Sequence, residues 1–346
     1  MRVHVTDLKP GDRLVSDTFN NHGLHVLNQG AVLNMSDISK LLQHGIDYVD
    51  IIPYVEDPKV TEFKNKALEL ARPTLTNAVD GFESLFHEAI TTGKINETMV
   101  DDIVEPMVEQ LTTYKDVVSL LISVEEQDDY TYHHSMQVGM LSYYMASWLG
   151  YSKEEALLAS KAGYLHDIGK CMISRDILNK PGKLTAEEFN EMKKHTLYGY
   201  EIIKDSIQDE VAALVALQHH ERDDGSGYPY QLKEHEVHPF SQITAVADVF
   251  SAMTTNRVYQ SRQELLVVLR EIYSLSFGKL NGKPTQVFIQ HMLPNFIGKK
   301  VSLSSGETGI IVMTNPTDYF RPLVKIGERF SDLAIERHIT IEHVYM

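Results

Sequence analysis

The sequence has one cysteine, one tryptophan and no long run of uncharged apolar residues. A lone cysteine, Cys171, cannot form a disulfide within the chain, which is typical of a reducing compartment. A membrane-spanning helix needs about 20 consecutive apolar residues, and the N-terminal segment also lacks the apolar core of a signal peptide. We therefore expect a cytoplasmic protein without a membrane span.

Positive charge is also scarce, with 32 Lys and Arg against 48 Asp and Glu and a net charge of −16. Nucleic-acid polymers and anionic membranes favour surfaces rich in Lys and Arg, so neither is expected as a general partner. A phosphate-bearing ligand would need local positive charge, which metal ions can supply. The 16 histidines are numerous for this length, and histidine is a common metal ligand.

The chain of 346 residues is too long to fold around a single hydrophobic core, so more than one compact unit is expected. Its periodicity changes from short alternating strands to helical spacing and back to strands, the last at 299–305, 308–315 and 322–327. This order predicts a mainly α protein whose central helical bundle is flanked by small β-rich segments at both ends. The predicted divisions are a β-rich domain at 1–57, a helical connection at 58–127, a central helical domain at 128–293 and a β-rich domain at 294–346.

Two helix starts carry capping-box chemistry. Ser152 precedes Glu155 by three residues, and Thr185 precedes Glu188 by three. In such a pair each side chain can satisfy a free backbone N–H of the first turn. We expect helices to begin directly after Ser152 and Thr185.

A series of His and Asp residues is spread over the predicted central helices, with about 24 to 32 residues between successive groups. This separation is the length of a helix, a loop and a second helix, so an antiparallel bundle could bring the groups to one level. The candidate metal ligands are His134, His166, Asp167, His195, His219, His220 and Asp248.

The apolar surroundings of these residues favour a metal site. His134 has Val138, Leu141 and Met145 at helical spacing, and Asp248 interrupts an otherwise apolar helix. A buried lone carboxylate costs several kcal/mol unless a cation or hydrogen bonds compensate it. A single histidine on an apolar face is more often a core residue, but the combination of a His–Asp pair, a His–His pair, a spaced His and a buried Asp favours function.

Five of these positions lie in three longer motifs, namely HDIGK at 166–170, HHERDDGSGYP at 219–229 and DVFSAMTTNRVY at 248–259. Together they resemble the signatures of HD-GYP phosphodiesterases, a branch of the HD hydrolase superfamily, over about residues 128–290. The resemblance implies an all-helical catalytic domain of the HD type. It also implies cleavage of cyclic di-GMP to the linear dinucleotide and often on to GMP.

By the same resemblance, His134, His166, Asp167 and Asp248 would hold one metal ion. Asp167 would bridge to a second ion held by His195, His219 and His220. The two divalent ions would be iron or manganese, both compatible with mixed imidazole and carboxylate ligands. A hydroxide bridging the two ions would then attack the phosphate in line.

The resemblance also implies roles around the metals. Lys170 would contact the attacking water and the phosphate, Asp128 would be an acidic partner on the other side, and Arg257 would grip phosphate by its planar fork. The turn containing Gly227 would form the lip of the site, with Tyr228 near a guanine base. The alternative for Lys170 and Asp128 is ordinary surface charge, and for the turn a tight backbone bend.

The sequence departs from the family pattern at four positions. Tyr130 stands where some members carry a glutamate for a third metal, so two metals are expected. Ser251, Asn256 and Gln260 stand where an Asp, often an Asp, and a Lys or Arg commonly occur. The loss of charge at Gln260 weakens the expected grip on phosphate.

These departures leave three functional hypotheses. The first is a hydrolase of a cyclic dinucleotide, with cyclic di-GMP favoured over the mixed GMP–AMP form. The second is a metal-containing protein that binds the nucleotide in signalling with weak or no turnover, and the third is an HD hydrolase of other phosphate esters. The β-rich ends carry no chemical motif, and we expect them to act as scaffolds or in self-association, for example as a homodimer.

Overall fold

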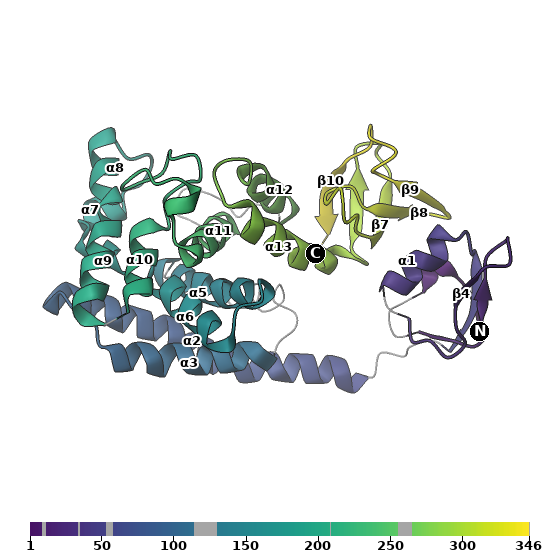
Figure 1. Ribbon diagram of the computed structural model, residues 1–346, viewed down its shortest axis with the longest axis horizontal. Helices are drawn as coiled ribbons and strands as arrows, with labels where there is room; N and C mark the ends of the chain where they lie inside the picture. Colours follow the sequence, from purple (N-terminus) through teal and green to yellow (C-terminus); the bar gives the residue numbers. More distant parts are fainter. Residues whose placement is uncertain are drawn as a thin grey trace. The chain divides into compact units, whose positions relative to one another are not determined.

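The structure is a computed structural model that describes residues 1–8, 12–33, 35–52, 58–113, 130–207, 209–254 and 265–345. It describes only the backbone of some of these, among them 58–71, 113, 130 and 131. Two compact units divide the chain, one of Lys66–Met292 and one that combines Met1–Asn65 with Leu293–Met346. The predicted fold class is confirmed, because helices dominate and short strands lie toward the two ends of the chain (Figure 1). The predicted division at 127/128 lies outside the described residues, and the one at 57/58 falls where the described part resumes at residue 58.

The helical unit is built around α5 (Tyr130–Trp148) and α6 (Lys153–Leu165). Residues on all sides of α5 are buried, which explains why its sequence is apolar without a single polar face. Small residues let the two helices approach closely, since a Cβ at Gly139 would press on Tyr164 and one at Gly163 on Ser142. These two helices therefore form a tightly packed centre for the unit.

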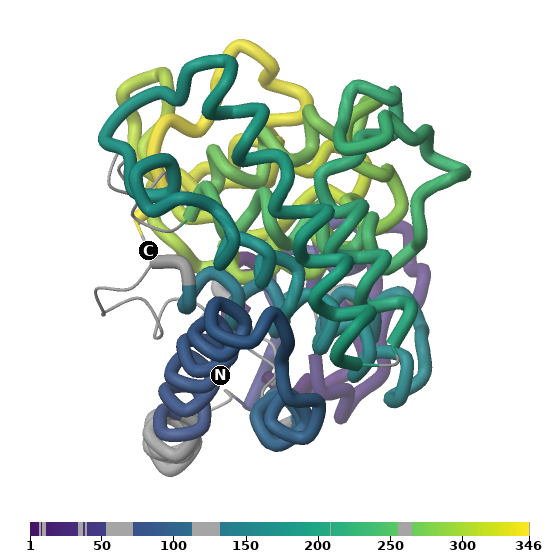
Figure 2. The backbone as a smooth tube through the Cα atoms, turned by 90° about the vertical axis from the view of Figure 1, so that its left-hand side faces the viewer, coloured from purple at the N-terminus to yellow at the C-terminus, as the bar shows by residue number. Residues whose placement is uncertain are grey.

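Two further helices, α2 (Pro58–Thr92) and α3 (Glu97–Thr113), lie side by side along the helical unit (Figures 1 and 2). Phe82 packs edge to face against Tyr164 at 5.2 Å between ring centroids. The buried Tyr164 hydroxyl donates a hydrogen bond to the Ala78 carbonyl oxygen at 2.5 Å. This hydrogen bond and the packing of the rings thus hold α2 against α6. Both helices lie within the predicted helical connection at 58–127.

Both predicted capping boxes are present. Ser152 Oγ accepts from the Glu155 N–H at 3.2 Å, and Glu155 Oε2 accepts from the Ser152 N–H at 2.8 Å, at the start of α6. The same reciprocal pair joins Thr185 and Glu188 before α8 (Ala186–Lys193). Each box therefore places the first residue of its helix as the sequence predicts.

The remaining helical elements complete the unit and lead out of it. In chain order they are η2 (Ile168–Met172), α7 (Arg175–Leu178), α9 (His195–Ser206), α10 (Glu210–Gln218), η3 (Glu234–Glu236), α11 (Pro239–Thr254), α12 (Leu265–Leu275), α13 (Gly282–Met292) and η4 (Leu293–Phe296). Among the described residues, no helix is long and apolar enough to cross a membrane.

The N-terminal segment forms small antiparallel sheets around its own apolar core. Its strands are β1 (Arg2–His4), β2 (Arg13–Leu14), β3 (Thr18–Phe19), β4 (His25–Leu27) and β5 (Tyr48–Ile52), with η1 (Val5–Asp7) and α1 (Met35–Gln43) between them. One sheet has the order β1-β5-β2 and the other pairs β3 with β4. The completely buried Val5 and Leu41 belong to the core of this segment.

The C-terminal segment forms a five-stranded antiparallel sheet with the order β10-β6-β7-β8-β9. The strands are β6 (Lys300–Leu303), β7 (Thr308–Met313), β8 (Leu323–Ile326), β9 (Arg329–Asp332) and β10 (Ile341–Tyr345). The first three were predicted, and the last two were not. Alternate residues of these strands are buried, as expected for a sheet with one covered face.

Candidate metal centre

The ends and faces of several helices bring all seven candidate ligands together. His134 lies within α5 and Asp248 within α11, His166 and Asp167 directly follow α6, His195 begins α9, and His219 and His220 directly follow α10. Their ligand atoms form two groups, and within each group all atoms lie within 4.8 Å of one another. The convergence expected from the helix-length spacing is thus present in the structure.

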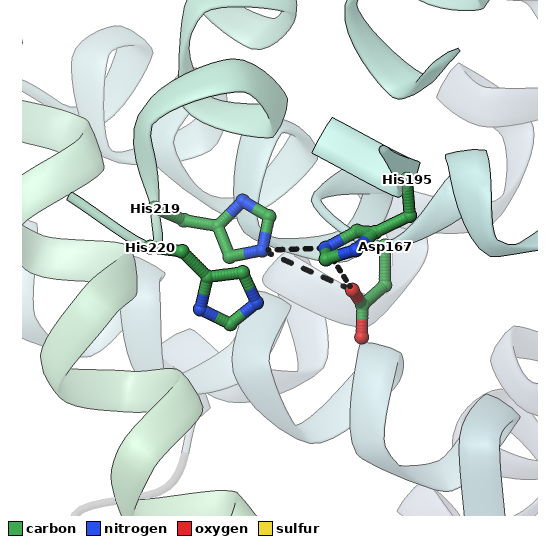
Figure 3. Close-up of side chains that lie close together, drawn as sticks. All are labelled: Asp167, His195, His219 and His220. Carbon is green, nitrogen blue, oxygen red and sulfur yellow. Dashed lines mark hydrogen bonds and ion pairs between the residues drawn. The ribbon is translucent and has the colours of Figure 1, made fainter. Parts of the chain in front are cut away.

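The first group consists of Asp167, His195, His219 and His220 (Figure 3). The Nε2 atoms of His195 and His219 lie 3.3 Å apart, and they lie 3.3 and 3.9 Å from Asp167 Oδ1. His220 stands beside His219, with 4.1 Å between the ring centroids. One carboxylate oxygen and several imidazole nitrogens therefore face one small volume.

The second group consists of His134, His166 and Asp248. Asp248 Oδ1 lies 3.2 Å from His134 Nε2 and 4.0 Å from His166 Nε2. The other oxygen of Asp167, Oδ2, faces this group at 3.7 Å from His134 Nε2 and 3.2 Å from His166 Nε2. Asp167 thus presents one oxygen to each group, which is the arrangement a bridging ligand needs.

Helix ends orient three of the histidines. The Nδ1 of His166 lies 2.8 Å from the Gly163 carbonyl oxygen, that of His195 2.7 Å from Met192 O, and that of His219 2.9 Å from Ala216 O. A carbonyl oxygen only accepts, so each Nδ1 carries a hydrogen, and in the neutral ring Nε2 keeps its lone pair. Free carbonyls near helix C-termini therefore select the tautomer that can bind a cation through Nε2.

Burial and neighbouring charges set the protonation states. Burial lowers the pKa of His195 to about 4 and holds the pKa values of His219 and His220 well below 6.5. Burial alone would raise the pKa of Asp167, but the adjacent His166 and Lys170 hold it well below its usual value. Neutral imidazoles and an ionised carboxylate are the forms that bind divalent metals.

The surroundings of two atoms in the centre are better explained by a bound cation than by a core without one. His166 Nε2 and Asp167 Oδ1 are buried and have no hydrogen-bond partner among the described residues. A buried acceptor without a partner is destabilising by about 1–3 kcal/mol or more. A divalent ion would satisfy both atoms, and the mixed nitrogen and oxygen donors suit a transition metal.

Lys170 lies in η2 beside the centre, and its Nζ contacts Asp167 Oδ2. Its side chain is 21% exposed, so it is neither a free surface charge nor a fully buried one. Asp128 and Arg257 lie outside the described residues, as do Asn256, Gln260 and the side chain of Tyr130. Of these predicted neighbours of the metals, only Lys170 is placed by the structure.

The loop after His220 packs its backbone directly on the His–His pair. A Cβ at Gly227 would overlap the Glu221 and Arg222 backbone, and the Tyr228 N–H donates to the His220 carbonyl oxygen at 3.2 Å. The buried Glu221 carboxylate accepts from the N–H groups of Tyr230 and Leu232, at 2.7 and 3.0 Å. The predicted tight turn is present, and the structure adds the carboxylate that holds it.

An aromatic surface continues outward from the centre. The Tyr228 ring lies 4.7 Å from the His220 ring and 6.2 Å from the Phe189 ring. Lys193 Nζ lies 5.3 Å from the Phe189 centroid and 5.9 Å from that of Tyr228. Phe189 and Lys193 were not predicted from the sequence. They lie one helical turn apart just before His195, and this spacing indicates a substrate-binding surface only when the helix is known to border the metal centre.

Ser251, which stands where the family commonly has an Asp, also contacts a ligand, a role that was not predicted from the sequence. Its Oγ lies 2.8 Å from His134 Nδ1. The departure from the family pattern therefore leaves this ligand with a hydrogen-bond partner.

A helical bundle that gathers a His–Asp pair and further His and Asp residues into one buried centre defines the HD class of metal-dependent proteins. The family described as "HD domain" matches residues 102–273. The chain is 35% identical over 269 residues to a cyclic di-GMP phosphodiesterase of Thermotoga maritima, a match that covers 75% of this chain and 72% of the relative. The chain therefore belongs to the HD domain family, in its HD-GYP branch, and the resemblance seen in the sequence is confirmed.

The similarity extends to further proteins. A cyclic di-GMP phosphodiesterase of Pseudomonas aeruginosa is 31% identical over 246 residues, covering 70% of this chain but only 59% of the relative's length. The solved structure of an HDG"Y"P protein from Bdellovibrio bacteriovorus superposes with a TM-score of 0.53 at 17% identity, covering 83% of this chain and 97% of that one. The structural likeness supports the fold.

Proposed function

We propose that this protein is a metal-dependent phosphodiesterase that hydrolyses cyclic di-GMP to the linear dinucleotide and further to GMP. The observation that carries the proposal is the Asp167 carboxylate, which has one oxygen on each of two buried groups of histidine and carboxylate ligands. The Thermotoga and Pseudomonas relatives are named as cyclic di-GMP phosphodiesterases, which supports this substrate class. The mixed GMP–AMP cyclic dinucleotide is the competing substrate.

We propose that the ions are two divalent ions, iron or manganese, which the mixed imidazole and carboxylate ligands would hold. Bound at this centre, the ions would stabilise negative charge on the phosphoryl oxygens and make water a strong nucleophile at neutral pH. The seven ligands are proposed as His134, His166, Asp167, His195, His219, His220 and Asp248.

The side chains around the ligands would bind and orient the substrate. Lys170 extends from η2 to Asp167, so its ammonium can donate to a phosphate placed at the ligands. Tyr228 and Phe189 offer aromatic faces on which a nucleobase can stack, and Lys193 adds positive charge beside both. Asp128, Arg257 and the backbone at Gly227 stay proposed contacts from the family resemblance.

The test is chromatography of products after incubation of manganese- or iron-loaded protein with cyclic di-GMP and, separately, with the mixed dinucleotide. We expect linear dinucleotide from cyclic di-GMP, and no product from Asp167→Asn. Asp205→Asn, which removes an exposed carboxylate at the end of α9, is the matched control and keeps activity. Preferred cleavage of the mixed form would change the proposed substrate.

The test also separates the alternatives. Tight binding of cyclic di-GMP without product would favour a binding protein in signalling, the hypothesis that the loss of charge at Gln260 supports. Neither binding nor turnover would favour an HD hydrolase of other phosphate esters. The homodimer stays a prediction, and light scattering of the full chain in solution tests it.

A further inference from the structure

Helices α5 and α11 meet through two pairs of polar residues, each pair one helical turn apart. His134 and Gln137 lie on one face of α5, and Asp248 and Ser251 lie on the facing side of α11. His134 contacts both residues of α11, Asp248 through Nε2 at 3.2 Å and Ser251 through Nδ1 at 2.8 Å. Ser251 Oγ in turn donates to Gln137 Oε1 at 2.5 Å. These four residues are buried, between 0 and 8% exposed.

The direction of this hydrogen-bond chain fixes the imidazole. A serine hydroxyl carries one hydrogen, and here that hydrogen goes to Gln137 Oε1, which only accepts. Ser251 Oγ must therefore accept at its contact with His134, so Nδ1 carries the imidazole hydrogen. Nε2 then presents its lone pair to the volume between Asp167 and Asp248.

The location of His134 within a helix explains why a side chain, and not a backbone carbonyl, is the hydrogen-bond partner of its Nδ1. His166, His195 and His219 each lie at a helix end and use a backbone carbonyl oxygen as the partner of Nδ1. His134 lies within α5, where the carbonyls of the preceding turn are engaged in the helix. Its Nδ1 partner comes instead from α11, 117 residues further along the chain.

We propose that Ser251, held by Gln137, is a positioning residue that sets the tautomer and ring orientation of His134 for metal binding. The inference rests on the metal centre of the proposed function and deepens it. Loss of a partner that orients a metal-binding histidine typically weakens metal affinity by about 10- to 100-fold. We expect a change of this size at the ion that His134 binds, with little change at the other.

The experiment is a Mn²⁺ titration of the full-length, metal-free protein, with free Mn²⁺ followed by electron paramagnetic resonance. Ser251→Ala removes the acceptor. Gln137→Leu keeps the serine but lets its hydroxyl turn to Nδ1, whereas Gln137→Glu keeps an acceptor for the hydroxyl. Ser160→Ala is the matched control, because Ser160 is a buried serine on α6 whose Oγ has no hydrogen-bond partner among the described residues.

We expect Ser251→Ala and Gln137→Leu to weaken one class of Mn²⁺ site by about 10- to 100-fold. Gln137→Glu and Ser160→Ala should bind as tightly as the unmodified protein or, for the glutamate, more tightly. Thermal melting without metal checks the folding of each variant. If Ser251→Ala does not fold, the comparison of Gln137→Leu with Gln137→Glu still tests the inference, because neither variant changes the serine.

The inference is overturned if Ser251→Ala and Gln137→Leu titrate like the unmodified protein, or if both classes of site weaken equally. Absence of Mn²⁺ binding by the unmodified protein would overturn the metal centre and this inference together. Normal Mn²⁺ binding without hydrolysis of any cyclic dinucleotide would instead overturn the proposed activity alone, so the two failures are distinguishable.

Discussion

Gly169 packs its backbone directly on that of Gly199, so η2 and α9 touch without a side chain between them. A Cβ added at Gly169 would overlap the Gly199 backbone nitrogen and the His195 carbonyl oxygen. This close approach brings the start of α9, and with it His195, to the Asp167 carboxylate at 3.3 Å. The glycine in the HDIGK motif is therefore tied to the geometry of the metal centre.

Gly169→Ala is expected to displace α9 and to weaken metal binding. Overpacking of this kind costs about 1–3 kcal/mol or more, because backbone atoms cannot move aside as side chains can. Urea denaturation should show the loss of stability, and Mn²⁺ titration the loss of affinity. Gly282→Ala, where an added Cβ meets nothing within 4 Å, is the control. Unchanged Mn²⁺ affinity in Gly169→Ala would contradict the proposed link to His195.

The features predictable from sequence are those that a short motif encodes. The capping boxes join residues that are three positions apart in the sequence. The metal ligands lie in helices or at helix ends, and the regular helix-length spacing between them predicts that they meet in one region of the bundle. The contact of Ser251 with His134 could not be predicted, because it joins helices that are distant in the chain. Likewise β9 (Arg329–Asp332) has the sequence RFSD, which lacks an apolar alternation, and only its pairing with β8 makes it a strand.

Cys171 is expected to react slowly with thiol reagents at neutral pH. Burial raises the pKa of its thiol to about 11, whereas a free cysteine has a pKa of about 8.5. Since only the thiolate reacts, iodoacetamide labelling of the folded protein should speed up about tenfold per pH unit until the pH approaches 11. Cys171 is the only cysteine of the chain, so the labelled fraction measures this site alone.

The matched control for Cys171 is the same protein unfolded in urea, whose labelling rate should level off above about pH 8.5. A folded-state rate that levels off near that pH as well would show that burial does not suppress the thiolate. Such a result would also make Cys171 a candidate for thiol oxidation.

Phe189→Ala should raise the KM for cyclic di-GMP by about tenfold and leave kcat nearly unchanged. Stacking of a base on an aromatic side chain contributes about 1–3 kcal/mol, and Phe189 is 47% exposed beside Tyr228. Initial rates over a range of substrate concentrations measure both constants. Ile90→Ala, which removes an exposed apolar side chain from α2, should change neither. A loss confined to kcat would argue against a role in substrate binding.

Ser152→Ala should lower the free energy of unfolding by about 1 kcal/mol, because the Glu155 N–H in the first turn of α6 loses its acceptor. Ser152→Asp retains an acceptor and should stay close to the unmodified protein. Urea denaturation at pH 7 measures both. Equal losses in the two variants would mean that the serine acts through something other than the cap.

Metal-free protein should lose stability as the pH falls from about 6.5 toward 4. Burial lowers the pKa of His195 to about 4 in the folded state, while an unfolded histidine titrates near 6.5. In this window the unfolded chain binds a proton that the folded protein does not, so the free energy of unfolding decreases as the pH falls. His219 and His220, whose pKa values are also lowered by burial, act in the same direction.

His166 opposes this trend, because the adjacent Asp167 outweighs burial and raises its pKa, but several lowered histidines act against this single raised one. Urea denaturation of the metal-free protein at pH 7.5 and 5.5 measures the difference, and His195→Gln, which cannot titrate, should show a smaller one. Saturating Mn²⁺ at pH 7.5 should add about 2.7 kcal/mol at 100 times its dissociation constant. A metal-free protein equally stable at both pH values would mean that these imidazoles are not kept neutral by burial.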